Sequence, residues 1–302
     1  MVRATPSINA YELVRDDGGE LPPFTAGAHL ELAAGPHRRH YSICNDPAER
    51  GRYVVAVQLS PSSRGGSRFI HEQLTVGSRI DDWQLRNAFP LDESASEYVF
   101  VAGGIGITPI ISMMKRARRL GTPFKLHYCA RTAGEALYRS EIVDEFGAEA
   151  TEFHFSACTG RWDPASLGRH AAGRQLYCCG PASLLGAALQ ATASWPAGSV
   201  HHEFFSADGA QLLTGSGAFE VVLASSGAVY GVPPGTSILR VLRQHGVDVP
   251  SACEAGACGT CQVRYLEGRP DHRDLFLSVE EQAEFLMPCV SRALSPRLTL
   301  DL

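Results

Sequence analysis

Four cysteines near the C-terminal end of the chain have a spacing that can hold an inorganic cluster. Three of them lie in the run C-E-A-G-A-C-G-T-C, a C-x4-C-x2-C pattern, and the fourth follows after a long gap. This is the plant-type spacing of a [2Fe–2S] cluster bound by four thiolates. The predicted ligands are Cys253, Cys258, Cys261 and Cys289. Because such a cluster transfers single electrons, the function must include a donor and an acceptor of single electrons.

The residues between these cysteines favour a cluster-binding loop. Gly256 and Gly259 fall between the ligands, and glycine permits positive φ and a close approach of backbone N–H groups to the cluster sulfurs. Zinc and disulfides are the alternatives. Structural zinc prefers paired short-spaced cysteines, of which only one pair is present. The nine cysteines are an odd number, which fits poorly with a disulfide framework.

A glycine-rich turn in the middle of the chain favours a nucleotide site. The apolar run 98–102 predicts a strand buried on both faces, followed by G-G-I-G-I-T-P and a helix to about residue 120. We place Thr108 at the N-cap of this helix and Pro109 at its first position. The start of a helix attracts phosphate, and glycines let a ligand lie against the backbone. The glycines concerned are Gly103, Gly104 and Gly106.

A second turn, C-C-G-P, ends a later predicted strand and opens another helix. The carboxyl ends of parallel strands line one crevice, where ligands bind. Cys179, Gly180 and Pro181 are therefore expected to face the same crevice as residues 103–108. The alternative for Cys179 is an ordinary buried thiol.

The N-terminal third contains two segments suited to a phosphorylated, flat cofactor. In R-H-Y-S, residues 39–42, strand alternation places Arg39 and Tyr41 on one face. An aromatic ring beside a guanidinium can contact a ring system and a phosphate. S-R-G-G-S, residues 63–67, adds a flexible loop with a second arginine. The alternatives are an exposed polar strand and an ordinary turn.

Strand and helix patterns divide the chain into three regions and a linker. Short β-like runs broken by Gly, Pro and Ser predict an antiparallel β-barrel at 1–92. Alternating strands and helices predict a doubly wound α/β domain with a parallel sheet at 96–206. A Gly/Ser-rich linker is expected at 207–217. The remainder, 218–302, reads as an α+β ferredoxin module with a helix capped by Ser237.

Composition narrows the function further. The net charge of −5 and the lack of a basic block argue against nucleic-acid binding. No apolar run is long enough for a transmembrane helix, and no apolar leader is visible at the N-terminus. With reduced cysteines, these features favour a cytoplasmic protein. We also expect a monomer.

Taken together, these motifs resemble the phthalate dioxygenase reductase family, the single-chain reductases of Rieske-type oxygenases, with vanillate demethylase reductases as near relatives. The motifs R-H-Y-S, S-R-G-G-S, G-G-I-G-I-T-P, C-C-G-P, H-H-E-F-F and the cysteine pattern occur in the family's order over nearly the whole chain. Two departures stand out: Gln58 replaces a frequent lysine, and the segment before the first barrel motif is short.

The resemblance implies an FMN-binding barrel, an NADH-binding domain and a C-terminal ferredoxin domain of the β-grasp type. It implies positioning roles at the flavin and nicotinamide for Thr108, Cys179 and Phe205, and cradling of the NADH pyrophosphate by Gly103, Gly104 and Gly106, with Gly180 and Pro181 beside them. The implied FMN contacts are Arg39, His40, Tyr41, Ser42, Ala56, Val57, Gln58, Arg64, Gly65, Gly66 and Ser67.

The implied activity is electron transfer from NADH through FMN and the [2Fe–2S] cluster to a separate Rieske oxygenase, which docks transiently. Two alternatives stay open: a reductase for another acceptor, such as a ferredoxin or a cytochrome, and a redox sensor that does not turn over NADH. The intact nucleotide turns argue against the sensor. NADPH in place of NADH also stays open.

Overall fold

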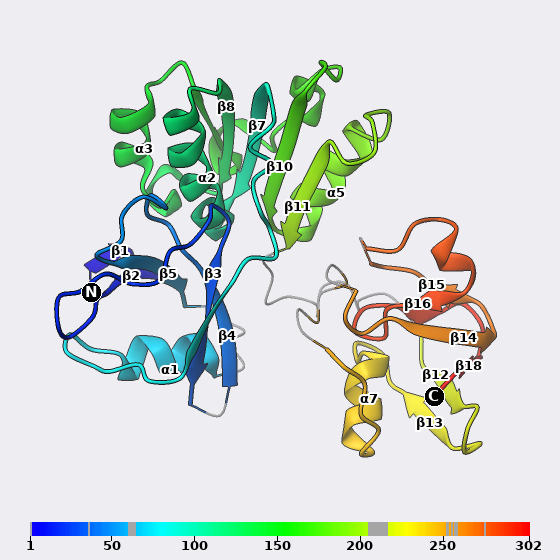
Figure 1. The fold of residues 1–302 in the computed structure, drawn as a ribbon. Coiled ribbons are helices and arrows are strands. Elements are labelled where there is room, and N and C mark those ends of the chain that lie inside the picture. Colours follow the sequence, from blue (N-terminus) through cyan, green and yellow to red (C-terminus); the bar gives the residue numbers. More distant parts are fainter. Residues whose placement is uncertain are drawn as a thin grey trace. The chain divides into compact units, whose positions relative to one another are not determined.

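The computed structural model describes residues 2–35, 37–59, 65–204, 217–251, 254, 256, 259–274 and 276–302. The chain divides into two compact units, Met1–Phe205 and Ser206–Leu302 (Figure 1). Part of the predicted site lies outside the described residues, namely Arg64, Phe205, Cys253, Cys258 and linker positions 207–216.

The first part of the N-terminal unit is a small antiparallel β structure, as predicted. Its two three-stranded sheets have the orders β1-β2-β5 and β4-β3-β6, and a bridge between Ile43 and Val55 connects them. Buried side chains from both sheets and from the helix, including Leu30 and Ile70, form one core. The elements are β1 (Val2–Thr5), β2 (Ile8–Leu13), β3 (His29–Ala34), β4 (His37–Ser42), β5 (Tyr53–Gln58), α1 (Gly66–Gln73) and β6 (Trp83–Arg86).

The second part of this unit has the predicted parallel sheet, in the order β11-β10-β7-β8-β9. Helices α2 and α3 lie on one side of it and α5 on the other (Figure 1). Its strands are β7 (Glu97–Gly103), β8 (Phe124–Ala130), β9 (Thr151–Phe155), β10 (Arg174–Gly180) and β11 (Val200–Phe204). Its helices are η1 (Gly104–Gly106), α2 (Ile107–Leu120), η2 (Ala133–Glu135), α3 (Arg139–Phe146), α4 (Ser156–Thr159), η3 (Pro164–Leu167) and α5 (Ala182–Ala191).

The start of α2 differs from the sequence prediction. Thr108 is not the N-cap, because the helix begins at Ile107 after a 3-10 turn and is preceded by Gly106. The Thr108 hydroxyl donates a hydrogen bond back to the carbonyl of Ile105 at 2.9 Å, so it does not cap a backbone N–H. The 3-10 turn adds helical residues that local capping rules do not anticipate.

The C-terminal unit has a five-stranded sheet in the order β13-β12-β18-β14-β16 and a separate β15-β17 pair. The predicted helix is present, and the Ser237 hydroxyl accepts a hydrogen bond from the Arg240 N–H at 3.2 Å, which confirms the predicted N-cap. The elements are β12 (Phe219–Leu223), β13 (Val229–Val232), α7 (Ile238–Gln244), β14 (Val263–Glu267), β15 (Pro270–Asp271), η4 (Glu281–Ala283), β16 (Phe285–Leu286), β17 (Arg292–Ala293) and β18 (Arg297–Leu300).

Candidate functional site

The two predicted nucleotide turns meet backbone to backbone at the carboxyl ends of β7 and β10. These strands are parallel neighbours, with Cys179 opposite Ala102. A Cβ placed on Gly106 would lie 2.3 Å from the carbonyl oxygen of Cys179, and one on Gly180 would lie 2.9 Å from the Cα of Gly103. Only glycine permits this approach, so the structure brings the two predicted turns into direct backbone contact, while the fully buried Cys179 side chain agrees with the alternative of an ordinary buried thiol.

The side chains of Thr108 and Cys179 are enclosed beside this crevice. Thr108 is 2% exposed and Cys179 is fully buried. Burial raises the pKa of the Cys179 thiol well above its ordinary value, so the thiol stays protonated at neutral pH. Neither group is poised to react as a nucleophile or base. Their geometry suits packing and positioning.

Glu203 is an ionisable residue to which the sequence analysis gave no role. It lies on β11 directly opposite Cys179. Although the residue as a whole is half-buried, its Oε2 is buried and has no hydrogen-bond partner among the described residues. Burial raises the pKa of Glu203 to about 7. A carboxyl group with this pKa can hold or release a proton near neutral pH. The only sequence signal was an acid between aromatic residues at the end of a strand.

Replacing Glu203 with glutamine is expected to remove a pH-dependent loss of stability. An unfolded glutamate releases its proton near its ordinary pKa of 4.5, whereas the folded chain retains it to about 7. Between these values the folded state binds more protons, so the free energy of unfolding falls as pH rises, by roughly 3 kcal/mol in total. Above pH 7 this contribution is constant. The stability of Glu203→Gln relative to wild type should therefore rise between pH 4.5 and 7.

Tryptophan fluorescence can measure this effect, since all three tryptophans lie in the N-terminal unit. Urea unfolding at a series of pH values gives the free energy for each variant. Glu149→Gln, which replaces an exposed carboxylate of the same unit, is the control. If the free energies of unfolding of wild type and Glu203→Gln differ by the same amount at every pH, the pKa of Glu203 is not raised in the folded protein.

The R-H-Y-S strand presents buried polar groups that need a partner. The Tyr41 hydroxyl and the Ser42 Oγ are both buried and have no hydrogen-bond partner among the described residues. Burial raises the pKa of Tyr41 to about 12. Buried hydroxyls are normally hydrogen-bonded, so this strand fits a bound ligand with polar edges.

Helix α1 begins beside the same strand. Gly65 is its N-cap, with a φ of 104°. A Cβ on Gly66 would lie 2.6 Å from the Arg39 Nε, so glycine allows Arg39 to lie across the start of the helix. Ser67 is in the first turn. A guanidinium at a helix N-terminus fits the phosphate of FMN.

Strand β5 brings its end to this helix. Beyond the bridge at Val55, none of the described strands pairs with β5 on the side away from β2. Ala56 and Val57 are buried and Gln58 is exposed. A ring nitrogen of His71 on α1 lies 2.8 Å from the Val57 carbonyl. The described residues predicted to contact FMN thus lie on three neighbouring elements, β4, β5 and α1. The His40 ring is stacked on His29 of β3.

Comparison with known proteins reveals the family. Residues 100–190 match an oxidoreductase NAD-binding domain, and residues 221–294 match a 2Fe-2S iron-sulfur cluster binding domain that spans all four predicted cysteines. The chain is 44% identical to the tert-butanol monooxygenase / tert-amyl alcohol desaturase reductase subunit of Aquincola tertiaricarbonis, covering 98% of this chain and 92% of that protein. It is 40% identical to the phthalate dioxygenase reductase of Burkholderia cepacia, covering 97% and 92%.

The solved structure of phthalate dioxygenase reductase, described as modular for electron transfer from pyridine nucleotides to [2Fe–2S], superposes with a TM-score of 0.72 at 38% identity, covering 100% of this chain and 95% of that one. The chain belongs to the phthalate dioxygenase reductase family. It is an NADH-dependent iron–sulfur flavoprotein reductase, with FMN and a [2Fe–2S] cluster as its cofactors.

The described part of the family's cluster loop is strongly turned. Gly256 and Gly259 both have a φ of +76°, and Glu254 has a φ of 51°. This confirms the conformational role predicted for the two glycines. Cys261 and Cys289 are 2% and 3% exposed and belong to the core of the C-terminal unit. Two buried thiols beside a glycine-turned loop fit the cluster that the family binds in this domain.

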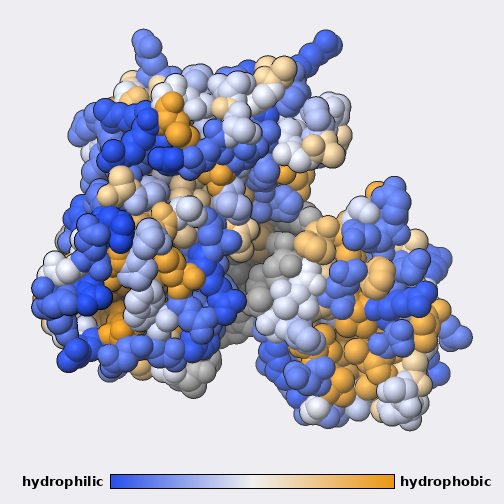
Figure 2. Space-filling model, in the orientation of Figure 1, coloured by the Kyte–Doolittle hydropathy of each residue, from blue (hydrophilic) through white to orange (hydrophobic). Residues whose placement is uncertain are grey.

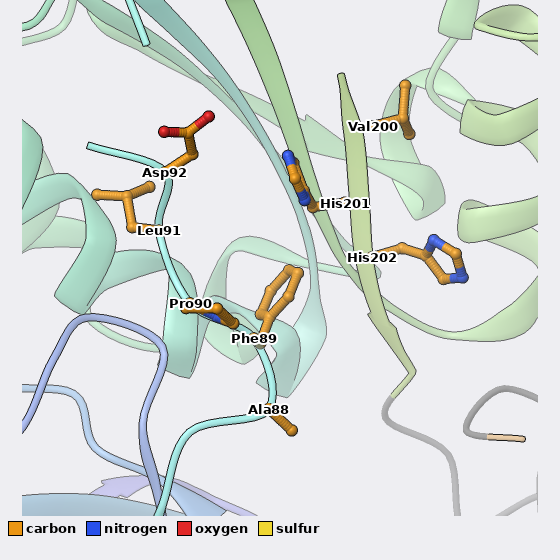
Figure 3. A pocket seen from close by; sticks show the side chains of 8 residues that line it. All are labelled: Ala88, Phe89, Pro90, Leu91, Asp92, Val200, His201 and His202. Carbon is orange, nitrogen blue, oxygen red and sulfur yellow. The ribbon is translucent and has the colours of Figure 1, made fainter. Parts of the chain in front are cut away.

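A cavity of about 410 Å³ lies in the N-terminal unit (Figure 3). Segment 88–92 and residues Val200, His201 and His202 of β11 line it. Figure 3 shows His201 and His202 on opposite sides of the strand. Of the predicted site residues that the structure describes, none lines this cavity. Among the described residues, none of the helices has the length and apolar character needed to cross a membrane.

Proposed function

We propose that this reductase passes electrons from NADH to a separate Rieske-type oxygenase. The observation that supports the proposal is the contact between the Gly106 and Cys179 backbones at the strand ends of the NAD-binding domain, in a chain that also has a 2Fe–2S domain. The chemistry supplied by bound FMN is the conversion of a two-electron donor into a one-electron donor. The residues of the chain supply binding, order and exclusion of water.

On the nucleotide side, Gly103, Gly104 and Gly106 would cradle the NADH pyrophosphate against η1 and the start of α2. Gly180 and Pro181 would form the opposite wall. The buried Thr108 and Cys179 would fix the position of the nicotinamide without exchanging protons with it. Phe205, which follows β11, would lie at the flavin. The Glu203 carboxyl opposite Cys179 would be neutral below about pH 7, so it would add no negative charge beside the nicotinamide.

On the flavin side, Arg39, with Gly65, Gly66, Ser67 and Arg64, would hold the FMN phosphate. Tyr41 and Ser42 would bind the polar edge of the ring system, since both hydroxyls are buried and lack a described partner. His40 would add a further contact to FMN from the same strand. The Ala56–Gln58 backbone would lie along the edge of the flavin ring. Gln58 supplies no charge, so this border is neutral.

Replacing Arg39 with alanine is expected to weaken FMN binding. A hydrogen bond to a charged group contributes about 1.5–3 kcal/mol, which corresponds to roughly 10- to 100-fold in affinity. Arg38 is the matched control, because it is the neighbouring arginine but pairs with Asp82 at 2.7 Å. FMN release measured by fluorescence should increase in Arg39→Ala and not in Arg38→Ala. If both variants bind FMN with equal affinity, Arg39 does not contact FMN.

On the acceptor side, the exposed surface of the C-terminal unit is suited to transient docking. Phe276 is 42% exposed, and its ring blocks the position of a Cβ on Gly259 in the cluster loop. Val279 is 81% exposed. Figure 2 shows apolar surface on this unit. Short-lived electron-transfer complexes bury small interfaces. We propose that the oxygenase docks at Phe276.

A cytoplasmic, monomeric enzyme is part of the same proposal. Thiolate ligands must stay reduced before the cluster is assembled, which the cytoplasm provides. Gel filtration and cell fractionation test these two statements.

Anaerobic titration of the purified holoprotein with NADH tests the function. Flavin bleaching followed by the electron paramagnetic resonance signal of a reduced [2Fe–2S] cluster would support it. Purified Rieske oxygenase, ferredoxin and cytochrome c are then compared as acceptors. If NADH never reduces the cluster, the protein is better explained as a redox sensor. If ferredoxin or cytochrome c is reduced in preference to the oxygenase, that protein and not the oxygenase is the acceptor.

A further inference from the structure

Three ionisable side chains meet on one face of the parallel sheet, away from the nucleotide crevice. His127 lies on β8, and Glu152 and His154 lie on β9, with His127 opposite Glu152 in the strand register. Alternation along each strand places the three on the same face. Leu126 and Tyr128, the neighbours of His127 in β8, point to the other face of the sheet, where they belong to the core that includes α2. The cluster is therefore distinct from the site at the strand ends.

The distances among the three donor groups match a metal site. His127 Nδ1 lies 3.3 Å from His154 Nε2 and 3.5 Å from Glu152 Oε2, and His154 Nε2 lies 3.7 Å from Glu152 Oε1. Zinc with ligand bonds of about 2.0–2.2 Å in a tetrahedron separates its ligand atoms by roughly 3.3–3.6 Å. Both distances from His127 fall within this range, and the distance from His154 to the other carboxylate oxygen is slightly longer. Two imidazoles and one carboxylate are also the ligand set of open zinc sites.

The surroundings hold the imidazoles in place. His127 is 5% exposed, and the Trp162 ring contacts both histidine rings, with centroids 5.6 Å and 6.2 Å away. Both rings are therefore packed against the same indole, on the same face of the sheet.

A cavity of about 290 Å³ opens beside these side chains. Glu152, His154 and the 159–163 segment line it, together with Ser166. The indole Nε1 of Trp162 is buried and has no hydrogen-bond partner among the described residues. A water in the fourth coordination position would have room here.

The nearby charges permit cation binding. Lys125 Nζ is 3.9 Å from Glu152 Oε2, but it donates its hydrogen bond to the Glu149 carbonyl at 2.9 Å. Arg161 and Asp163 line the cavity and oppose one another in sign. The 3.3 Å contact between His127 Nδ1 and His154 Nε2 brings together the two ring nitrogens that would bind the cation.

We propose that His127, Glu152 and His154 form a zinc site, with water as the fourth ligand in the adjoining cavity. Zinc would connect β9, the edge strand of the sheet, to β8 and would stabilise the 159–163 segment above it. The site needs no electron transfer and is independent of the proposed function.

The test is equilibrium dialysis of the full-length holoprotein against micromolar zinc chloride, with zinc and iron measured together. Iron content shows that the cluster is intact, so zinc is not counted at the four cysteines. We expect about one zinc ion per chain in wild type. Glu152→Gln and His154→Gln should lose it. Both change partly exposed positions, which makes misfolding less of a concern than at the buried His127.

Glu149→Gln and His170→Gln replace the same residue types in the same domain outside the cluster, and both should retain the zinc. Zinc should also raise the thermal midpoint of the wild type by several degrees, followed by tryptophan fluorescence, and should not do so in Glu152→Gln or His154→Gln. Zinc uptake that is absent in wild type, or equal in wild type and both ligand variants, would overturn the proposal.

Discussion

Replacing Gly106 with alanine is expected to lower the rate of NADH-dependent flavin reduction by about 100-fold or more, because errors of about 1 Å in positioning have effects of this size. The new Cβ would lie 2.3 Å from the Cys179 carbonyl oxygen and 2.9 Å from the Gly180 nitrogen. An ordinary contact begins at 3.4 Å, so the two walls of the crevice must separate by about 1 Å. Gly106 has a φ of −62°, so the effect comes from the overlap and not from backbone strain.

The measurement is stopped-flow absorbance of the flavin after anaerobic mixing with NADH. Gly186→Ala is the control, since a Cβ at this position on α5 meets nothing within 4 Å. Flavin content and the cluster spectrum should be unchanged in both variants. If Gly106→Ala is reduced by NADH as fast as Gly186→Ala, the crevice between the two turns is not where the nucleotide binds.

The outline of the fold and the two nucleotide turns could be predicted because they depend on local chemistry. Buried parallel strands are continuous apolar runs, and glycines are required where backbones touch, as at Gly103, Gly106 and Gly180. The cysteine spacing needs even less context, since four thiolates must reach one cluster. In these places residue type and spacing carry the whole physical requirement.

The start of α2 could not be predicted from local rules. Thr108 followed by Pro109 is a good capping sequence. The chain is already helical at Ile107, because η1 packs Gly106 against β10 and leads directly into the helix. The position of the first residue of α2 is therefore set by β10, a strand about seventy residues further along the chain.

Glu203 and the His127 cluster escaped prediction for a related reason. The carboxyl of Glu203 has a raised pKa only because β11 pairs with β10 and buries it beside Cys179. Glu152 and His154 are two residues apart, which places them on one face of a strand. Their third partner, His127, is fixed by the register of β8 against β9, and that register is not visible in the sequence.

Replacing Gly256 with alanine is expected to cost the protein most of its [2Fe–2S] cluster. Gly256 has a φ of +76°, a conformation that costs an L-residue about 1–2 kcal/mol. The added Cβ would lie 2.6 Å from Val290 Cγ2 and 3.0 Å from the Asp274 Cα. Overpacking of this kind adds about 1–3 kcal/mol. Because Val290 follows the ligand Cys289, relief of the overlap displaces a thiolate.

Iron and sulfide content per chain and the visible spectrum measure the loss. NADH-dependent reduction of ferricyanide, which the flavin alone can support, should remain, whereas transfer to a one-electron protein acceptor should fall with the iron content. Gly231→Ala on β13 is the control, because its Cβ meets nothing within 4 Å in the same unit. A Gly256→Ala protein with full iron content would show that the loop tolerates a side chain there. A variant that loses the cluster and ferricyanide reduction together would show that the two units do not work as separable modules.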